Sequence, residues 1–341
     1  MQHRANNFDA LRLLGALMVF YSHQFALAGH DEPLLDAGTN TTFGSLGVYL
    51  FFSISGFLIL QSWRADPDAH RFIQRRFLRI WPGMAAAIVA SALFLWAVTP
   101  VDGWQVLGYL SNLWCLGCNQ GNAFFPANAH TGLYGSMWTI PLEVQCYALV
   151  LAAGMLFRRH LGVFVTLLAG MAMLVPLARE FVPLIVLERI HAAGWRWPSA
   201  GVCGAFFLAG CVICCHAELR ARAWLPVLGG VLLMARGHVM EGMVFALPAA
   251  TVWIGTRSWP VMRDAGRFGD LSYGIYLWAW PVQQMVVMAW GRVLPLAALG
   301  ALSLALTLVL AWASWHLVEN RALKLKPRSA ASGSPGGAPG S

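Results

Sequence analysis

The stretch FGSLGVYLFFSISGFLILQS, residues 43–62, runs for twenty residues without one charged side chain. A helix of that length is about 30 Å long, which matches the hydrocarbon core of a bilayer. The whole chain of 341 residues is 58% hydrophobic and only 11% charged, with a mean hydropathy of +0.60. An ordinary soluble domain carries about 25% charged residues. We therefore expect an integral membrane protein.

Segments of similar character recur along the chain. No stretch of more than about 40 residues lacks an apolar run, which leaves no room for a large extramembrane domain. The pattern predicts an all-α membrane protein with about ten transmembrane helices, near residues 8–28, 43–62, 80–99, 136–157, 160–179, 199–216, 221–236, 240–256, 270–290 and 294–318. We expect one membrane domain over residues 1–325 and a flexible tail, rich in Ser, Gly, Pro and Ala, over residues 326–341.

The net charge of +8 indicates topology and not a nucleic-acid partner. If both termini are cytoplasmic, 17 of the 23 Lys and Arg residues fall on inner segments. Arg12 lies within the first helix, and five fall on outer segments: Arg179, Arg189, Arg196, Arg236 and Arg292. This bias follows the positive-inside rule, so we expect both termini in the cytoplasm. The arginine and phenylalanine residues interleaved in the inner segment 63–79 are typical of an interfacial helix on the cytoplasmic surface.

The seven cysteines do not predict a metal site. Five of them fall in apolar spans, where a thiol is usually a small hydrophobic group. Cys115 and Cys118 form a C-x-x-C pair in an outer loop, and only His130 is near enough to add a ligand. A disulfide or two free thiols is therefore a better interpretation than zinc, and we expect no metal.

Three ionisable residues lie where a bilayer makes charge costly: Arg12, His23 and Glu143. Arg12 and His23 are eleven residues apart, which is three helical turns plus about 20°, so they share one helix face with His23 about 16 Å farther along. Counting residues from the expected helix ends puts His23 and Glu143 at a similar depth. They are candidates for a catalytic base and the carboxylate that orients it, or for a hydrogen-bonded pair that ties two helices.

Arg76 and Arg79 are spaced i,i+3 and so face the same way at the expected inner surface. Two guanidinium groups in this arrangement can hold phosphates. Basic residues beside a membrane also have a simpler explanation, as a topology and lipid-headgroup signal.

These residues lie in motifs that resemble the acyltransferase 3 family of bacterial membrane acyltransferases. The first-helix motif is Asn7-Phe8-Asp9-Ala10-Leu11-Arg12 with Tyr21-Ser22-His23. The later motifs, in order, are residues 51–59 (FFSISGFLI), 76–82 (RFLRIWP), 138–143 (WTIPLE), 271–278 (LSYGIYLW) and 314–320 (SWHLVEN). The resemblance extends over about residues 8–325, and the ordered set is far more specific than any one motif.

The resemblance implies an enzyme of the bacterial inner membrane that transfers an acyl group from acyl-CoA, most often acetyl-CoA, to a hydroxyl of an exported glycan. Arg76 and Arg79 would hold the nucleotide phosphates, and His23 would deprotonate the acceptor with Glu143 orienting it. Arg12 would either steady the thioester or pair with Asp9 one turn earlier.

One position departs from the family pattern. Members commonly carry a histidine after the S-Y-x-x-Y-L-W motif, and here that position is Ala279, so no catalytic role transfers to it. Many relatives also have a fused extracytoplasmic transferase domain, and we expect this chain either to complete the transfer itself or to pass the group to a separate partner.

A non-enzymatic transporter or flippase is the alternative, with His23 and Glu143 as its proton or substrate site. A CoA-dependent enzyme needs the Arg76-x-x-Arg79 pair, whereas a proton-coupled carrier does not.

Overall fold

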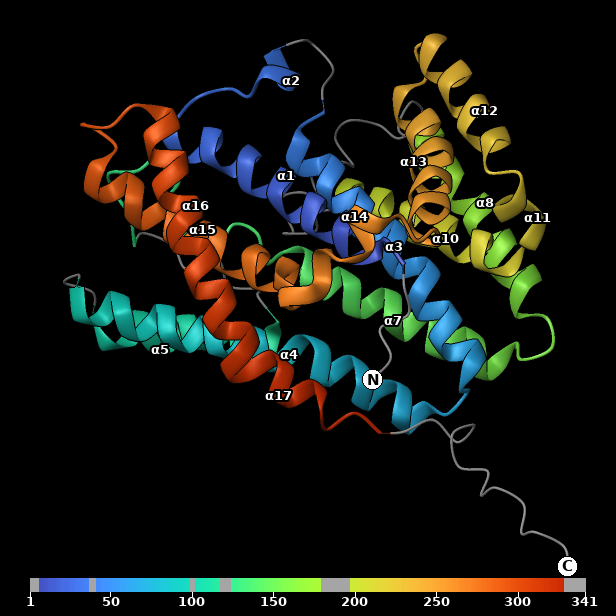
Figure 1. Ribbon diagram of the computed structural model, residues 1–341, viewed down its shortest axis with the longest axis horizontal. Helices are drawn as coiled ribbons and strands as arrows, with labels where there is room; N and C mark the ends of the chain where they lie inside the picture. The colour runs from blue at the N-terminus through green and yellow to red at the C-terminus, as the bar shows by residue number, and fades with distance from the viewer. Residues whose placement is uncertain (1–5, 37–40, 99–101, 117–123, 179–196, 328–341) are drawn as a thin grey trace, which may run out of the picture.

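The computed structural model describes residues 6–36, 41–98, 102–116, 124–178 and 197–327. All regular structure in these ranges is helical (Figure 1). The long helices are α1 (Phe8–Ala28), α3 (Phe43–Ala65), α4 (Ala69–Val98), α7 (Thr139–Leu156), α8 (Leu161–Ala178), α10 (Trp197–Cys215), α12 (Trp224–Ala235), α13 (Val239–Gly255), α15 (Leu271–Trp290) and α16 (Leu296–Ser314).

Short helical segments connect or extend the long ones. They are α2 (Pro33–Asp36), α5 (Gly103–Leu110), α6 (Asn112–Cys115), α11 (Ala217–Ala221), α14 (Pro260–Arg263), the 3₁₀ turn η1 (Ala265–Phe268), the π-helical turn η2 (Trp315–Glu319) and α17 (Asn320–Leu323). Because η2 and α17 follow α16 directly, the last helix runs on from residue 296 to residue 323.

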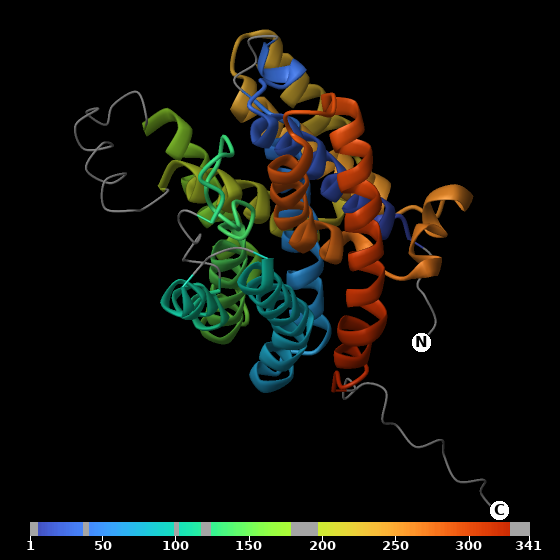
Figure 2. The ribbon, with the colours of Figure 1, turned by 90° about the vertical axis from the view of Figure 1, so that its left-hand side faces the viewer.

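Helix α3 lies at the centre of the fold and contacts α1, α7, α10 and α13. On one side of it, α1 packs against α15, and α15 and α16 lie side by side (Figures 1 and 2). On the other side, α10 packs against α8 and α13, and α12 packs against α13. Helix α4 contacts α15, η2 and α17, so the beginning of α4 and the end of the last helix meet.

Within the described ranges, five helices are long and apolar enough to cross a membrane: α1, α3, α4, α7 and the continuous segment Leu296–Leu323. A sixth is added if α13 and Pro260–Arg267, which meet at 83°, count as one span. Each of the ten expected spans does contain a helix, but the apolar parts of α8, α10 and α12 are shorter than a full span. The chain is an all-helical membrane protein, while ten crossings and two cytoplasmic termini stay predictions.

Helix α15 has the length of a span but carries two buried glutamines, whose Nε2 groups both donate hydrogen bonds within the bundle. Gln283 Nε2 donates to the carbonyl oxygen of Phe20 (2.9 Å) and to Oε1 of Gln24 (3.1 Å). Gln284 Nε2 donates to the carbonyl oxygens of His130 and Gly132, both at 2.7 Å. Buried amides with partners of this kind are tolerated because the hydrogen bonds replace those lost to water.

Residues 63–79 do not form a separate interfacial helix. The chain turns at Asp66, and residues 69–79 are the first turns of the 30-residue helix α4. Arg71 and Arg75 both donate to the Asp66 carboxylate, with Nη2 to oxygen distances of 2.6 Å. The hydrogen bond from Arg71 and then that from Arg75 lower the pKa of Asp66 to about 2, although burial opposes this. These ion pairs fix the α3–α4 corner, so arginines expected to face lipid headgroups bind a carboxylate of the same chain.

Residues 124–135 were expected to lie in an outer loop between the spans 80–99 and 136–157, but they pack inside the helical bundle. Phe125, Leu133 and Tyr134 are fully buried. The Tyr134 hydroxyl donates to the carbonyl oxygen of Ala87 on α4 (2.8 Å), and Trp280 Nε1 on α15 donates to the carbonyl oxygen of Gly132 (3.0 Å). Helix α7 therefore begins within the bundle and not at its surface.

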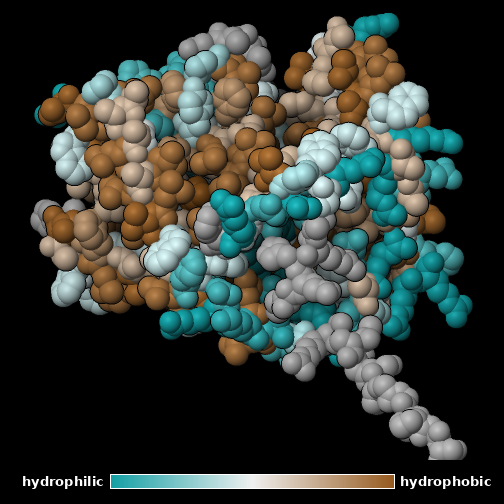
Figure 3. Space-filling model, viewed as in Figure 1, coloured by the Kyte–Doolittle hydropathy of each residue, from teal (hydrophilic) through white to brown (hydrophobic). Residues whose placement is uncertain are grey.

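Hydrophobic side chains cover much of the left of the face shown in Figure 3, and hydrophilic ones gather on its lower and right-hand sides. The expected tail falls mainly on residues 328–341, which lie outside the described residues, as does Cys118 of the C-x-x-C pair. Lys326 and Pro327 are described and pack against the helical domain.

The crossing of α3 and α10 gives a test of the fold. A Cβ at Gly56 would lie 1.9 Å from the carbonyl oxygen of Phe207, so the backbones approach too closely for any side chain there. We expect Gly56→Ala to lower the stability by about 1–3 kcal/mol through overpacking. Thermal unfolding in detergent, followed by tryptophan fluorescence, measures this.

Gly204→Ala is the matched control. Gly204 lies on α10, the helix that α3 crosses at Gly56, and a Cβ there meets no atom within 4 Å. It should unfold at the parent temperature or slightly above, since alanine favours a helix by up to about 1 kcal/mol over glycine. Equal stability of the two variants would contradict the close crossing.

Candidate functional site

A cavity of about 830 Å³ lies where the beginnings of α1, α4 and α15 meet α7, the middle of α3 and the end of the last helix. Its lining includes Arg12, Arg76, Arg79 and Glu143, four of the five residues that the sequence marked as candidates. They come from three helices, α1, α4 and α7. The structure therefore brings Arg76 and Arg79 into one cavity with two of the three intramembrane ionisable residues, Arg12 and Glu143.

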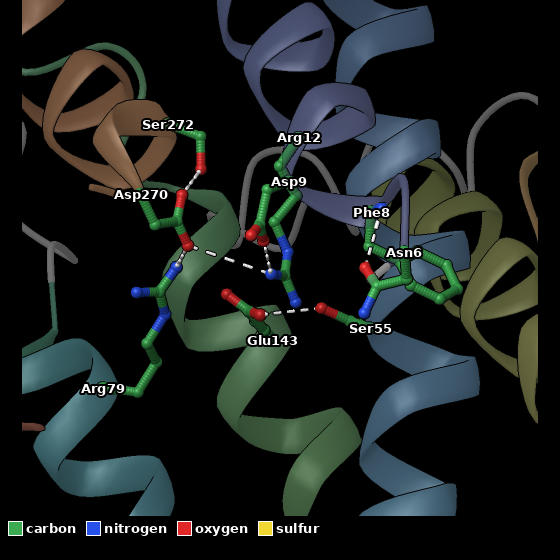
Figure 4. A network of polar contacts seen from close by, with 9 residues as sticks. All are labelled: Asn6, Phe8, Asp9, Arg12, Ser55, Arg79, Glu143, Asp270 and Ser272. Atoms are coloured by element: carbon green, nitrogen blue, oxygen red, sulfur yellow. Dashed lines mark hydrogen bonds and ion pairs between the residues drawn. The ribbon is translucent and has the colours of Figure 1, made fainter. Parts of the chain in front are cut away.

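Asp270 is the centre of the ionic network in this cavity (Figure 4). Arg79 Nη2 donates to its Oδ2 at 2.5 Å, and Arg12 Nη1 lies 3.8 Å from the same oxygen. Arg12 also donates to Oδ1 of Asp9 at 3.3 Å, which is one of the two expectations for this arginine. The carboxylate thus joins α1 to α4 through two guanidinium groups. Such pairing offsets the cost of placing charge in an apolar surrounding.

A glycine turn puts Asp270 in place. Gly269 has a φ of +108°, a conformation that side-chain-bearing residues rarely adopt, and an added Cβ would lie 2.1 Å from Nε1 of Trp315. The turn leads from η1 into α15, and Ser272 Oγ donates to Oδ1 of Asp270 at 2.5 Å. Both carboxylate oxygens are therefore occupied, one by Ser272 and one by the arginines.

Glu143 lies on α7 and points toward Arg12 and Ser55 (Figure 4). Ser55 Oγ on α3 donates to its Oε1 at 3.0 Å, and the Tyr147 hydroxyl, one turn farther along α7, donates to the same oxygen. The motif residues Ser55 and Glu143 are thus a contact between α3 and α7 at the wall of the cavity.

Arg76 differs from its neighbours because no carboxylate is paired with it among the described residues. Its guanidinium lies 5.7 Å from the centre of the Phe72 ring and 5.9 Å from that of Tyr147. Its Nε is buried without a hydrogen-bond partner in the described part of the chain. Among the described residues this half-buried guanidinium contacts two aromatic faces and no carboxylate, so it is available to an anionic ligand.

His23 does not line this cavity. Its ring lies against Trp280, edge to face, with centroids 4.8 Å apart, and His130 contacts the same indole at 5.7 Å. Nδ1 of His23 is buried and has no hydrogen-bond partner in the described ranges.

The expected pairing of His23 with Glu143 is not formed. His23 is level with Trp280, and Tyr276, one turn earlier on α15, hydrogen-bonds Thr139 at the start of α7 (2.5 Å). Glu143 lies one further turn along α7, so the two side chains are separated by about two turns, or about 11 Å. The depth estimate assumed that α7 starts at the membrane surface, whereas the buried segment 124–138 moves its start into the bundle.

Tyr276 and Thr139 mark the limit of the cavity on the side of His23. Both line it, and the Tyr276 hydroxyl also donates to the carbonyl oxygen of Ser136. The cavity therefore ends about one helical turn from the layer that holds Trp280 and His23.

The sequence did not single out Asp270. Asp270 stands directly before the motif Leu271–Trp278, and a carboxylate at the start of an expected span was a usable signal. Trp280 follows Ala279, and its side chain packs against His23.

The described residues contain no group of three His, Cys, Asp or Glu that could hold a metal ion. Five cysteines are free thiols: Cys146, Cys203, Cys211, Cys214 and Cys215.

The charge of the cavity favours a polyanion. Its lining has five Lys or Arg side chains, namely Arg12, Arg76, Arg79, Arg267 and Lys326, and three carboxylates, namely Asp9, Glu143 and Asp270. The excess positive charge lies in a cavity with partly apolar walls, where electrostatic attraction is stronger than in water.

Comparison with known proteins agrees with the motifs. The acyltransferase domain of the acyltransferase 3 family matches residues 6–316. An O-acetyl transferase of Shigella phage Sf6 is 30% identical over 94% of this chain and 97% of its own length. Nodulation protein 10 of Rhizobium leguminosarum bv. viciae is 26% identical over 95% of this chain and 94% of its own. A protein of Komagataeibacter xylinus, named as a proposed membrane-bound transacylase, is 26% identical over 96% of this chain and 85% of its own. No solved structure matches the chain.

The cavity brings together residues from the motifs of the first, third and fourth expected spans, and the family match covers nearly all of the helical domain. The chain therefore belongs to the acyltransferase 3 family and is a membrane acyltransferase.

Proposed function

We propose that this protein transfers an acetyl group from cytoplasmic acetyl-CoA to a hydroxyl of an exported or cell-surface glycan, in the bacterial inner membrane. The observation that carries the proposal is the polyanion cavity with Arg12, Arg76 and Arg79, together with His23 on the same helix as Arg12. The cavity would hold the donor, and His23 would act on the acceptor.

The length of the donor fits this division. Arg12 and His23 are eleven residues apart on α1, a rise of about 16 Å. A pantetheine arm of some fifteen bonds extends over about 15–20 Å at ordinary bond lengths. With the phosphates beside Arg76, the thioester would lie near Tyr276 and Thr139, and a shift of the Tyr276 side chain would open the last turn toward His23.

The chemistry needs one base and one thioester. The imidazole of His23 would take the proton of the acceptor hydroxyl as its oxygen attacks the thioester carbonyl carbon. The new C–O bond forms, the C–S bond breaks, and the CoA thiolate leaves and takes up the proton from the imidazolium. The Nδ1 of His23, buried without a partner among the described residues, is consistent with a ring that still has to receive a proton or a hydrogen bond. Glu143 would not orient His23 directly, as the sequence suggests. It would instead hold the cavity wall in position through Ser55 and lie beside Arg12.

Support for the acceptor class comes from the surroundings of His23 and from the relatives. The indole of Trp280 contacts the rings of both His23 and the exposed His130, and aromatic faces suit sugar rings. The Shigella phage relative is named an O-acetyl transferase.

A separate extracytoplasmic transferase that receives the acetyl group from this chain is compatible with the same site. The transporter alternative has less support, because the match is to an acyltransferase family and Arg76 and Arg79 both line the cavity.

The first test concerns the donor. Arg76→Ala should weaken acetyl-CoA binding at least tenfold, because a charge-assisted contact contributes about 1.5–3 kcal/mol. Isothermal titration calorimetry of the purified protein measures this. Arg158→Ala removes one exposed arginine away from the cavity and should bind acetyl-CoA like the parent. Equal affinity of the Arg76 variant and the parent would contradict the donor site.

The second test concerns the base. His23→Gln should lower the rate of transfer by about 10²–10⁴-fold while acetyl-CoA affinity stays at the parent value, because glutamine keeps hydrogen bonding but cannot accept the proton. Mass spectrometry of the glycan and the calorimetric affinity measure the two effects. His30→Gln makes the same change at an exposed histidine just beyond α1 and should leave the rate unchanged. A folded His23→Gln protein with the parent rate would refute the assignment.

A further inference from the structure

Lys326 is a cation that neither the motifs nor the expected phosphate clamp include. It follows α17 directly and lines the cavity. Its backbone N–H donates to the carbonyl oxygen of Leu323 (3.3 Å), and the next carbonyl oxygen, of Pro327, accepts from Nη2 of Arg75 (3.4 Å). Arg75 is itself held by Asp66. The segment that carries Lys326 is thus attached to α4 beside the cavity.

The ammonium group of Lys326 has no carboxylate partner among the described residues. Burial, and then the positive charges of Arg79, Arg76 and Arg12, lower the pKa of Lys326 to about 8, with only Asp270 acting in the opposite direction. A half-buried ammonium near three guanidinium groups is unfavourable by itself. An anion bound between Lys326 and these arginines would remove the repulsion.

The position of Lys326 in the cavity indicates which part of the donor would contact it. The cavity extends from the C-terminal segment beside α4 to Tyr276 and Thr139, the side nearer His23. If the thioester points toward His23, the nucleotide end of acetyl-CoA lies at the opposite end, beside Lys326. That end carries the diphosphate and the 3′-phosphate, whereas the pantetheine arm carries no charge.

On the basis of the proposed function, we propose that Lys326 binds a phosphate of the donor nucleotide and, with Arg76, makes the cavity selective for acyl-CoA over acyl-pantetheine donors. A CoA thioester can thereby be distinguished from a donor with the same arm and no nucleotide phosphates.

Steady-state kinetics with two donors tests the proposal. For Lys326→Met, KM for acetyl-CoA should rise about tenfold or more, as expected for loss of one charge-assisted contact, with kcat kept. KM and kcat for S-acetylpantetheine should not change, which also shows that the variant is folded. Lys326→Arg should keep most of the affinity for acetyl-CoA.

Lys324→Met is the matched control, because Lys324 is exposed, two residues earlier, and not part of the cavity lining. It should behave like the parent with both donors. An unchanged KM for acetyl-CoA in Lys326→Met, or an equal rise for both donors, would overturn the proposal.

The same experiment separates this proposal from the proposed function. If Arg76→Ala weakens acetyl-CoA binding and Lys326→Met does not, the donor site stands and the role of Lys326 fails. If neither parent nor variants discriminate between acetyl-CoA and S-acetylpantetheine, the nucleotide site itself fails.

The pH dependence gives a second readout. The Lys326 ammonium binds phosphate only while it is protonated, and it loses its proton above about pH 8. In the parent, KM for acetyl-CoA should therefore rise above that pH. Lys326→Arg should remove this rise, because a guanidinium stays charged. A rise of the same size in the arginine variant would overturn the role of Lys326 and assign the effect to another titratable or charged group in the cavity lining or on the elements packed beside it, namely Asp9, Arg12, Arg75, Arg76, Arg79, Glu143, Tyr147, Arg267, Asp270, Tyr273, His316 and Glu319.

Discussion

The carboxylate of Asp270 is the contact on which the arrangement of the site depends. Through Oδ2 it holds Arg79 of α4 at 2.5 Å and Arg12 of α1 at 3.8 Å. Helices α1, α4 and α15 therefore meet at one charged group, and the cavity lies among them. Without this carboxylate the two guanidinium groups would repel each other in an apolar surrounding, which is among the most costly arrangements in a membrane protein.

The same network divides the arginines by role. Arg12 and Arg79 are neutralised by carboxylates of the chain, whereas Arg76 is held by the rings of Phe72 and Tyr147. A ligand phosphate is attracted most by the charge that no carboxylate already satisfies. Arg76 is thus the arginine best suited to contact the donor, and Arg79 is better described as a positioning residue, although the sequence treats the two as equivalent.

Much of this was predictable from the sequence because it depends on local patterns. Each apolar run became a helix near its expected bounds, since runs of that length satisfy their backbone within one helix. The i,i+3 spacing of Arg76 and Arg79 does put both on the cavity.

The position of His23 relative to Glu143 could not be predicted, because it depends on how far the segment 124–138 enters the bundle. That segment is held by tertiary contacts such as Gln284 to His130 and Tyr134 to Ala87, which no periodicity encodes. Asp270 was missed for a similar reason, since its partners are 191 and 258 residues away in the chain.

The central claim is that the donor lies in the cavity with its thioester directed toward His23. An electron cryomicroscopy structure of the protein with a non-hydrolysable acetyl-CoA analogue tests it most directly. The account predicts nucleotide phosphates within hydrogen-bond distance of Arg76 and the thioester carbonyl beside Tyr276, on the side of His23. A nucleotide bound outside the cavity, or an acetyl group directed away from His23, would contradict it.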